Sequence, residues 1–483
     1  NYKEKYLFEA NVRYDGSYVF RNGKRWGTFP SFSLGWNLYN ESFWENIEPY
    51  VNTLKVRASW GQLGNQNISP YSDLELIPIS ADKLNWIFNY GSTRPVGYTS
   101  GPNLVNRNLT WETATTTNVG MDLSFLNNRL SATVDWFERR TIDMVGPSQA
   151  MPGVLGTSVP KENNSTLRTR GWEISLNWKH ALENGLSYNL GISLYDYKSV
   201  VTKYFNPTGT LSTWYEGAEV GDIWGYTVND LFRSQEDLDS YLSKVDMTHI
   251  AANWNTGDLK YEDINHDGKV NNGTNTIGNH GDLSVIGNDQ PHYQYTINGG
   301  VSYKGFDFSM LWRGVAKKDM YFYRGSNIYW GFMGGWWESC LTPEHLDYFR
   351  DQPGSKYSGL YEGDANINTD AYWPRPYLNN TEEAKNKNHA NTRYLQNAAY
   401  LRLQNVQLGY SFPRSITSKM HLEKLRIYFS GENLLTFSKL PSGIDPVAPV
   451  GFPTGGEFFG TAGSGRLTYG ADRIYSIGLT VTY

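Results

Sequence analysis

Large apolar and small or polar residues alternate strictly at the end of this chain. From Tyr475 to Tyr483 every odd position carries Tyr, Ile, Leu or Val, and every even position carries Ser, Gly or Thr. Successive side chains of a strand point to opposite faces, so this segment has one wholly apolar face. A transmembrane β-barrel has this pattern, with lipid outside and water inside. An edge strand of a soluble β-sandwich is the alternative.

The same alternation recurs along the whole chain. In a soluble sandwich the apolar face would meet a second sheet, so alternation alone does not separate the two cases. Within residues 399–412 the alternation slips by one position, which predicts a bulge near Gln404-Asn405. Residues 94–99 and 222–232 also look extended but fall inside long connections. We predict spanning strands near residues 6–14, 27–38, 53–61, 113–125, 129–138, 168–178, 186–197, 294–303, 306–315, 399–412, 423–432 and 473–483.

The lengths of the connections favour the membrane barrel. Short turns at Asn127-Asn128, Lys304-Gly305 and Glu183-Asn184-Gly185 suit tight hairpins. They alternate with long connections, which are uncommon in compact domains above about 12–15 residues. Outer-membrane barrels have this asymmetry, with short periplasmic turns and long extracellular loops, and only residues 39–52 depart from it. The long loops cover about residues 62–112, 139–167, 198–293, 316–398 and 433–472.

We therefore predict an all-β fold, a transmembrane antiparallel β-barrel to which this chain contributes about twelve strands. Charged residues on the opposite strand face, including Arg57, Asp122, Asp135 and Arg426, predict a hydrated lumen or contact with a plug. No signal peptide precedes Asn1, and an exported barrel needs one. We expect the chain to be the C-terminal part of a longer protein.

Composition agrees with a barrel. Hydrophobic residues make up 39% of the chain, and no run approaches the ~18 apolar residues of a membrane helix. The aromatic content of 15%, with 17 Trp and 35 Tyr, suits interfacial girdles. A net charge of −5 argues against nucleic acid as a partner, and the single Cys340 excludes an internal disulfide. The His residues are scattered and no zinc motif is present, so we predict that the protein is not an enzyme.

Several segments resemble one known family. The chain is similar to the barrel of SusC/RagA-type TonB-dependent transporters over nearly its whole length. The matching segments are Tyr6-Leu-Phe-Glu-Ala-Asn-Val-Arg-Tyr-Asp-Gly16, Trp26-Gly-Thr-Phe-Pro-Ser-Phe-Ser-Leu-Gly-Trp36, Leu54-Lys-Val-Arg-Ala-Ser-Trp-Gly-Gln-Leu-Gly-Asn65, Arg170-Gly-Trp-Glu-Ile174, Gly257-Asp-Leu-Lys-Tyr-Glu-Asp-Ile-Asn-His-Asp-Gly268, Tyr400-Leu-Arg-Leu-Gln-Asn-Val-Gln-Leu-Gly-Tyr410 and Ser430-Gly-Glu-Asn-Leu-Leu-Thr436.

The resemblance implies a plugged barrel of about 22 strands in the bacterial outer membrane, of which these would be the last twelve. It implies that the N-terminal plug and the first strands lie outside this sequence. It further implies active import of a glycan or oligopeptide with a SusD-like surface lipoprotein as a lid, energy from TonB-ExbB-ExbD through the plug, outer-membrane lipid around the barrel, and a dimer of transporter-lid pairs. A siderophore or vitamin receptor without a lid, a passive porin and a soluble carbohydrate-binding protein are the alternatives.

One loop carries a calcium-binding pattern. Asp263, Asn265 and Asp267 are followed by Gly268 in a D-x-N-x-D-G motif, in which oxygen side chains converge on a hard cation. The twelfth position is Thr274 rather than an acid, so we expect an insertion to loop out and return Asp282 as the last ligand. An Asx-rich turn without metal is the alternative. The predicted ligands of a structural Ca²⁺ are Asp263, Asn265, Asp267, Lys269 through its carbonyl, Asn271 and Asp282.

Aromatic residues of the outer loops are candidates for contact with a ligand or a lid. Sugar rings and peptides both dock on Trp and Tyr, but the same rings could pack the loops onto one another. Helix start signals lie in the same loops, at Ser234 and at Thr342-Pro343. The predicted contact residues are Tyr329, Trp330, Trp336, Trp337, Tyr372 and Trp373.

Overall fold

The computed structural model describes most of the chain. It describes residues 1–21, 23–66, 68, 74–75, 104–149, 154, 159–322, 327–333, 341–353, 367–377, 380–447 and 471–483. No helix in this described part of the chain is both long and apolar enough to cross a membrane.

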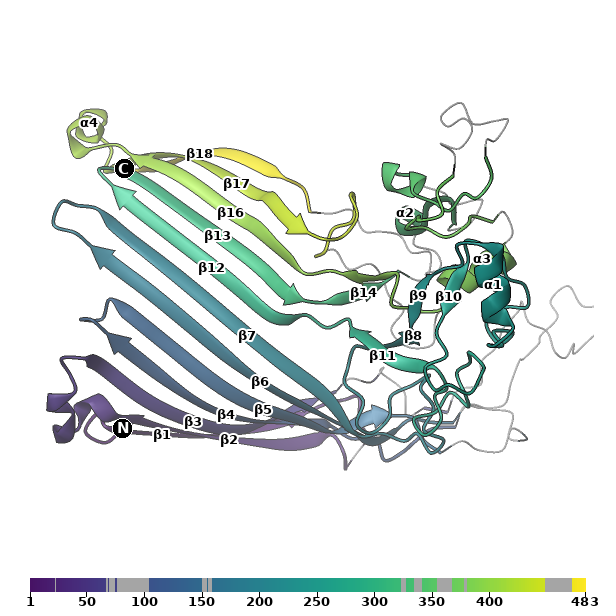
Figure 1. The fold of residues 1–483 in the computed structure, drawn as a ribbon. Helices are drawn as coiled ribbons and strands as arrows, with labels where there is room; N and C mark the ends of the chain where they lie inside the picture. The colour runs from purple at the N-terminus through teal and green to yellow at the C-terminus, as the bar shows by residue number, and fades with distance from the viewer. Residues whose placement is uncertain are drawn as a thin grey trace, which may run out of the picture. The chain divides into compact units, whose positions relative to one another are not determined.

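Twelve long strands form one antiparallel sheet in which each strand pairs with the next long strand along the chain (Figure 1). All twelve predicted strands are present, in the predicted order. They are β1 (Tyr6–Gly16), β2 (Trp26–Asn37), β3 (Val51–Asn65), β4 (Glu112–Phe125), β5 (Leu130–Gly146), β6 (Glu162–Ala181), β7 (Ser187–Lys203), β12 (His292–Tyr303), β13 (Phe306–Lys317), β16 (Tyr400–Ser411), β17 (Lys424–Ser438) and β18 (Ile474–Thr482).

Several strands continue farther toward the long loops than we predicted. β5 ends at Gly146 rather than near 138, and β6 begins at Glu162 rather than near 168. The predicted 139–167 loop is therefore shortened to residues 147–161. The extension begins at Glu138-Arg139-Arg140, where charged residues occupy both faces and the alternation ends. Backbone hydrogen bonding continues there without an apolar face, so a hydrophobic pattern does not reveal it.

The short turns and the bulge are where the sequence predicted them. Asn127 and Asn128 have φ values of 57° and 59°, and Lys304 and Gly305 have 49° and 90°. Asn and Gly tolerate this left-handed region better than other residues do. On β16, Asn405 pairs with Leu311 of β13 and Leu403 pairs with the next residue, Trp312, which leaves Gln404 as the extra residue of the bulge.

Among the described residues, no second sheet covers the apolar face of the long sheet. Phe8, Leu34 and Ile477 are 64%, 59% and 79% exposed, and other large apolar residues on this face are also exposed. A β-sandwich would bury these side chains in its core. This exposure removes the sandwich alternative and matches a barrel whose apolar face meets lipid.

The polar face carries ion pairs that span three strands. Arg57 on β3 binds Asp122 on β4 at 3.1 Å and Asp135 on β5 at 2.6 Å. Gly120 lies between Arg57 and Asp135 in the register, and a Cβ there would come within 2.4 Å of the Asp135 carboxylate. Because Gly120 has no side chain, the two charged groups meet across the middle strand.

An arginine on the apolar face is expected to destabilise the barrel. Val134 lies five residues into β5 and pairs with Met121, so Val134→Arg would place a charge near the bilayer midplane. The expected loss of unfolding free energy is about 2–4 kcal/mol. Thr133→Arg, on the polar face beside Asp122, is the matched control and should be tolerated. Equal urea-unfolding midpoints in lipid vesicles for the two variants would contradict this assignment of faces.

The described chain divides into two compact units. The first comprises Asn1–Asn177, Tyr195–Thr208 and Trp214–Val220, and the second comprises Trp178–Leu194, Gly209–Thr213 and Gly221–Tyr483. The first contains β1 to β5 and the short 3-10 helices η1 (Leu38–Asn40) and η2 (Ser42–Asn46). The second contains β12 to β18 of the long sheet and most of the smaller elements.

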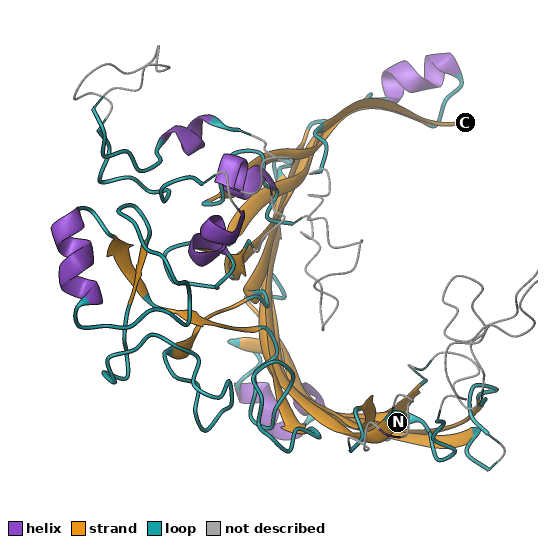
Figure 2. Cartoon of the chain, turned by 90° about the vertical axis from the view of Figure 1, so that its right-hand side faces the viewer, coloured by secondary structure: helices purple, strands orange, loops and turns teal. Residues whose placement is uncertain are grey.

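Short strands and helices fill the connections of the second unit (Figure 2). The extended segment 222–232 forms two strands that pair outside the long sheet, β8 with β11 and β9 with β10. These elements are β8 (Asp222–Tyr226), β9 (Val228–Leu231), α1 (Gln235–Leu242), β10 (Leu259–Tyr261), β11 (Leu283–Asn288), β14 (Asp319–Tyr321), α2 (Asn327–Trp330), η4 (Gly331–Met333), η5 (Pro343–Leu346), α3 (Asn380–Lys387), β15 (Leu395–Asn397), α4 (Arg414–Thr417) and η7 (Ser418–Met420).

Both predicted helix starts are confirmed. The Ser234 side chain accepts a hydrogen bond from the Asp237 backbone N–H at 3.2 Å and caps α1. Thr342 and His345 form a reciprocal capping box at η5, which is a single 3-10 turn with Pro343 at its first position.

Candidate functional site

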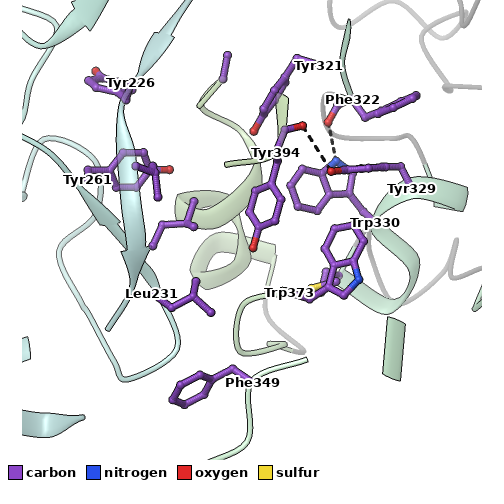
Figure 3. Packing of buried hydrophobic residues seen from close by; sticks show 14 of the residues in the cluster. Tyr226, Leu231, Tyr261, Tyr321, Phe322, Tyr329, Trp330, Phe349, Trp373 and Tyr394 are labelled. Carbon is purple, nitrogen blue, oxygen red and sulfur yellow. Dashed lines mark hydrogen bonds between the residues drawn. The ribbon is translucent and has the colours of Figure 1, made fainter. Parts of the chain in front are cut away.

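The two longest connections of the second unit fold into a domain with its own core. We call the described residues of 221–291 and 318–399 the loop domain. Its largest fully buried side chains include Trp330, Tyr261, Tyr321, Tyr329 and Tyr394. Figure 3 shows these rings gathered from separate segments of the two connections. The loop domain is therefore held together by aromatic packing, independently of the apolar face of the long sheet.

Three of the predicted contact residues lie inside this core. Tyr329, Trp330 and Trp373 are 1%, 0% and 3% exposed. The Trp330 indole N–H donates to the Phe322 carbonyl at 2.6 Å, and the Trp373 ring stacks on Tyr394 (Figure 3). These rings pack the loops onto one another, which is the second of the two roles that the sequence allowed. Their faces are not available to a ligand in this structure.

Tyr372 is the predicted contact residue that reaches the surface. It is 36% exposed, and its ring lies 5.9 Å from the Arg393 guanidinium carbon. Its hydroxyl lies 3.1 Å from the Tyr329 hydroxyl and accepts from the Gln396 amide at 3.1 Å. The core thus fixes an exposed ring beside a cation. Ligand or lid contact by Tyr372 stays a prediction, and Trp336 and Trp337 lie outside the described residues.

The predicted calcium loop is closed by side-chain to backbone hydrogen bonds. The Asp263 carboxylate accepts from the N–H groups of Asp267 at 3.2 Å and Gly268 at 2.8 Å. The Asn265 carbonyl oxygen accepts from the Asp267 N–H at 3.0 Å, and the Asp267 carboxylate accepts from the Lys269 N–H at 2.9 Å. His266 and Gly268 adopt positive φ values of 61° and 81°, as a tight Asx turn requires.

Asp282 returns to this loop after an excursion of ten residues, as the insertion argument expected. It is fully buried, and its carboxylate accepts from the N–H groups of Ile264 at 2.9 Å and Asn271 at 2.8 Å. Burial raises the pKa of Asp282, and the backbone donors oppose this shift. In the described part of the chain, no three His, Cys, Asp or Glu side chains are grouped to hold a metal. Asp282 therefore acts here as a backbone-binding anchor, and calcium binding stays a prediction.

Calcium should stiffen this loop if the predicted ligands bind it. Chelation of the purified protein is then expected to speed hydrogen exchange in residues 257–287 without changing exchange in the long strands, because a hard cation would be shared by oxygens of one loop only. Asp267→Ala should abolish the effect, and Asp246→Ala, outside the motif, should retain it. Identical exchange with calcium and with chelator would leave the metal-free Asx turn as the role of the motif.

A buried network of charges in α3 was not predicted. Lys385 and Asp258 are both fully buried, and the Lys385 ammonium lies 2.8 Å from the Asp258 carboxylate. Asp258 also accepts from the Tyr377 hydroxyl at 2.8 Å and the Asn386 amide at 2.9 Å, and Asn386 in turn accepts from the Leu259 N–H. The network ties residues near 258 to α3, more than a hundred residues later. The sequence Asn380-Thr-Glu-Glu-Ala-Lys-Asn-Lys387 looks like a solvated helix, so its charges gave no signal.

A second buried acid, Glu383, belongs to α3 itself and is only partly compensated. Glu383 is 1% exposed. One carboxylate oxygen accepts from the Tyr377 N–H at 2.8 Å, and the other has no hydrogen-bond partner among the residues that the structure describes. Burial raises the pKa of Glu383 to about 8, although Lys387 opposes this shift. Burial also raises the pKa of Asp258, against the attraction of Lys385. Both shifts have the same cause, because a low-dielectric interior penalises the ionised carboxylate.

Comparison with known proteins agrees with this arrangement of strands and loops. The family model described as TonB dependent receptor-like, beta-barrel, matches residues 1–434. The chain belongs to this family. TonB-dependent receptor barrels are outer-membrane transporters and not enzymes, which agrees with the predicted location and with the predicted absence of catalysis.

Two named relatives cover most of the chain. TonB-dependent receptor SusC of Bacteroides thetaiotaomicron is 26% identical over 462 residues, which is 92% of this chain and 41% of that protein. TonB-dependent receptor P3 of Formosa agariphila is 25% identical over 466 residues, again 92% of this chain and 41% of that protein. The chain thus spans about two fifths of the length of the curated relatives it matches.

The solved structure of the RagAB peptide importer in the open-open state has the same fold. It superimposes with a TM-score of 0.70 at 18% identity and covers 99% of this chain, while the chain covers 45% of that one. The RagAB peptide transporter structure gives a TM-score of 0.64 at 20% identity over 90% of this chain. The long sheet is therefore part of a TonB-dependent receptor barrel, as the sequence predicted.

Proposed function

We propose that the protein to which this chain belongs imports a large nutrient, a glycan or an oligopeptide, across the outer membrane with energy supplied through TonB. A SusD-like surface lipoprotein would close over the outer loops as a lid. The observation that carries the proposal is the loop domain itself. Its aromatic core and buried ion pair make the loops a fixed platform, which a partner can bind without first ordering them.

The exposed chemistry of the loop domain suits such a partner. Tyr372 presents a ring beside Arg393, and Arg233 binds Asp230 at 2.7 Å on the same surface. Aromatic and Arg side chains are enriched at protein interfaces, and aromatic faces also bind sugars and peptides. The names SusC and RagAB peptide importer belong to related proteins and support the substrate class by analogy.

A receptor of the siderophore or vitamin type is the second candidate, because the barrel fold serves it equally. A passive porin is the third. These alternatives differ in two requirements: the lidless receptor needs TonB but no lipoprotein, and the porin needs neither.

The deciding experiment is purification of the complete protein from its native membrane, followed by uptake assays with glycans and oligopeptides. We expect a lipoprotein to copurify with it, and native mass spectrometry to show transporter-lid pairs or a dimer of such pairs. Tyr372→Ala should weaken lid binding, whereas Tyr18→Ala, at an exposed tyrosine outside the loop domain, should not. Full uptake without a lipoprotein would favour the lidless receptor, and full uptake without TonB would favour the porin.

A further inference from the structure

The one long periplasmic link carries an exposed apolar stripe that the transport function does not use. Residues 38–50 connect β2 to β3 through η1 and η2, seen as the purple coils at the end of these strands in Figure 1. The N–H groups of Glu48 and Val51 donate to the carbonyls of Trp44 and Ile47, so helical bonding continues past η2. Residues 42–51 therefore form a short helical element, and Glu41 immediately before it has an extended backbone.

Its apolar residues recur at helical spacing. Tyr39, Phe43, Ile47 and Tyr50 are 38%, 53%, 38% and 77% exposed. Phe43, Ile47 and Tyr50 are four and three positions apart on one continuous stretch of helical bonding, so these three side chains form a stripe on one side of it. Tyr39 lies before Glu41, whose backbone is extended, and is not part of the stripe. Trp44 is buried instead, and its indole N–H donates to the Val51 carbonyl at 3.0 Å, which closes the segment onto itself.

Glu41 fastens this segment to the lipid side of the sheet. One of its carboxylate oxygens accepts from the Tyr6 hydroxyl at 2.8 Å and the Trp36 indole N–H at 3.2 Å, and the other binds Lys5 at 2.9 Å. Tyr6 and Trp36 stack on each other and share the strand face of Phe8 and Leu34, which is the exposed apolar face. Because Tyr6 and Trp36 on this apolar face hold Glu41, the segment begins on the lipid side of the sheet and not on the side of the lumen.

We propose that residues 38–50 lie in the periplasmic leaflet of the outer membrane as an interfacial anchor of the barrel. This inference rests on the proposed membrane barrel, since the apolar stripe continues the face that we assign to lipid. Tyr6 and Trp36 supply the aromatic girdle at that level, with their polar edges on Glu41. An amphipathic element of this kind binds by burying its apolar side chains at the headgroup boundary.

The charges of the segment predict which lipid headgroups it contacts. Residues 38–50 contain Glu41, Glu45 and Glu48 and no Lys or Arg. A negative surface repels acidic segments, so the headgroups that fit are zwitterionic phospholipids. Within the helical stretch, Glu45 and Glu48 stand two positions before Ile47 and Tyr50, which places these acids on a different side of the element from the apolar stripe.

The test uses spin labels on the complete transporter in phosphatidylcholine nanodiscs. Cys340→Ser removes the single thiol of this chain, and any Cys elsewhere in the transporter is replaced in the same way. Phe43→Cys, Glu45→Cys or Leu34→Cys then adds one labelling site. Collision with oxygen reports lipid and collision with a nickel chelate reports water. We expect a several-fold higher ratio of oxygen to nickel collision at position 43 than at position 45, close to the ratio at position 34.

Each other outcome contradicts either the proposed anchor or the lipid-facing assignment of the sheet on which it rests. Equal ratios at positions 43 and 45, with a high ratio at position 34, would show a hydrated link below a genuine membrane barrel and overturn the anchor alone. Protection of position 43 from both reagents would mean that a protein covers it, which also overturns the anchor. Nickel access at position 34 would instead reject the lipid-facing assignment of the sheet.

Discussion

Replacing Lys385 with methionine is expected to destabilise the loop domain by about 3–5 kcal/mol, because it leaves the Asp258 carboxylate buried without its cation. Methionine keeps the length of the side chain, so lost packing contributes little. The loss should appear as backbone hydrogen exchange about 150- to 5,000-fold faster near Leu259 and in α3, where the network holds both segments. Exchange in the long strands should not change.

Two variants separate the buried charge from lysine itself. Lys424→Met, at an exposed position at the start of β17, should leave the loop domain unchanged. The double variant Asp258→Asn with Lys385→Met removes both charges and should recover part of the lost stability, since the cost lies mainly in the unpaired carboxylate. Wild-type exchange in Lys385→Met would mean that the ion pair does not hold the loops together.

Stability of the loop domain is expected to fall as pH rises from about 4.5 to about 8. Glu383 has a pKa of about 8 when folded, whereas its ordinary value is 4.5. Between these values the folded domain keeps a proton that the unfolded chain has released. One such proton lowers the unfolding free energy by about 1.4 kcal/mol per pH unit. The stabilisation is complete below the lower value and is lost as pH rises through the folded pKa.

Glu383→Gln should remove this contribution, because glutamine has the shape of the protonated acid and does not titrate. The measurement is the opening free energy of α3 amides between pH 5 and 8, from hydrogen exchange corrected for intrinsic rates. Glu382→Gln is the matched control: a hydrogen bond from Lys385 lowers the pKa of Glu382, so it does not titrate in this range. The prediction is wrong if wild type and Glu383→Gln show the same slope.

These two effects bear on the proposed import, because a lid of the proposed kind needs a platform that does not move when it closes. The same buried carboxylates that fix the loop domain make it more stable in mildly acidic surroundings than in alkaline ones. If the lid docks near Tyr372, its affinity for the transporter should follow the stability of α3 and of the aromatic core beneath that residue. Lid binding would then weaken in Lys385→Met even though no contact residue has changed.

The sequence by itself determined the long sheet. Local alternation shows which residues lie on each face of a strand. Turns such as Asn127-Asn128 and Lys304-Gly305 are recognised from short segments that contain Asn or Gly, which accept positive φ. The bulge at Gln404 and the cap at Ser234 are equally local. The resemblance to the receptor family added the remaining architecture and the import hypothesis. The strand faces, the turns, the bulge and the helix cap all depend on residues that are a few positions apart.

Only the tertiary structure decided how the loops use their side chains. An exposed and a buried aromatic residue look alike in a sequence, so Trp330 and Tyr372 were predicted together, yet the first is buried and the second reaches solvent. Asp258 and Lys385 lie 127 positions apart, and Lys385 belongs to a helix whose composition suits a solvated surface. Burial of such charges depends on long-range packing that supplies partners and excludes water, and no local pattern records that packing.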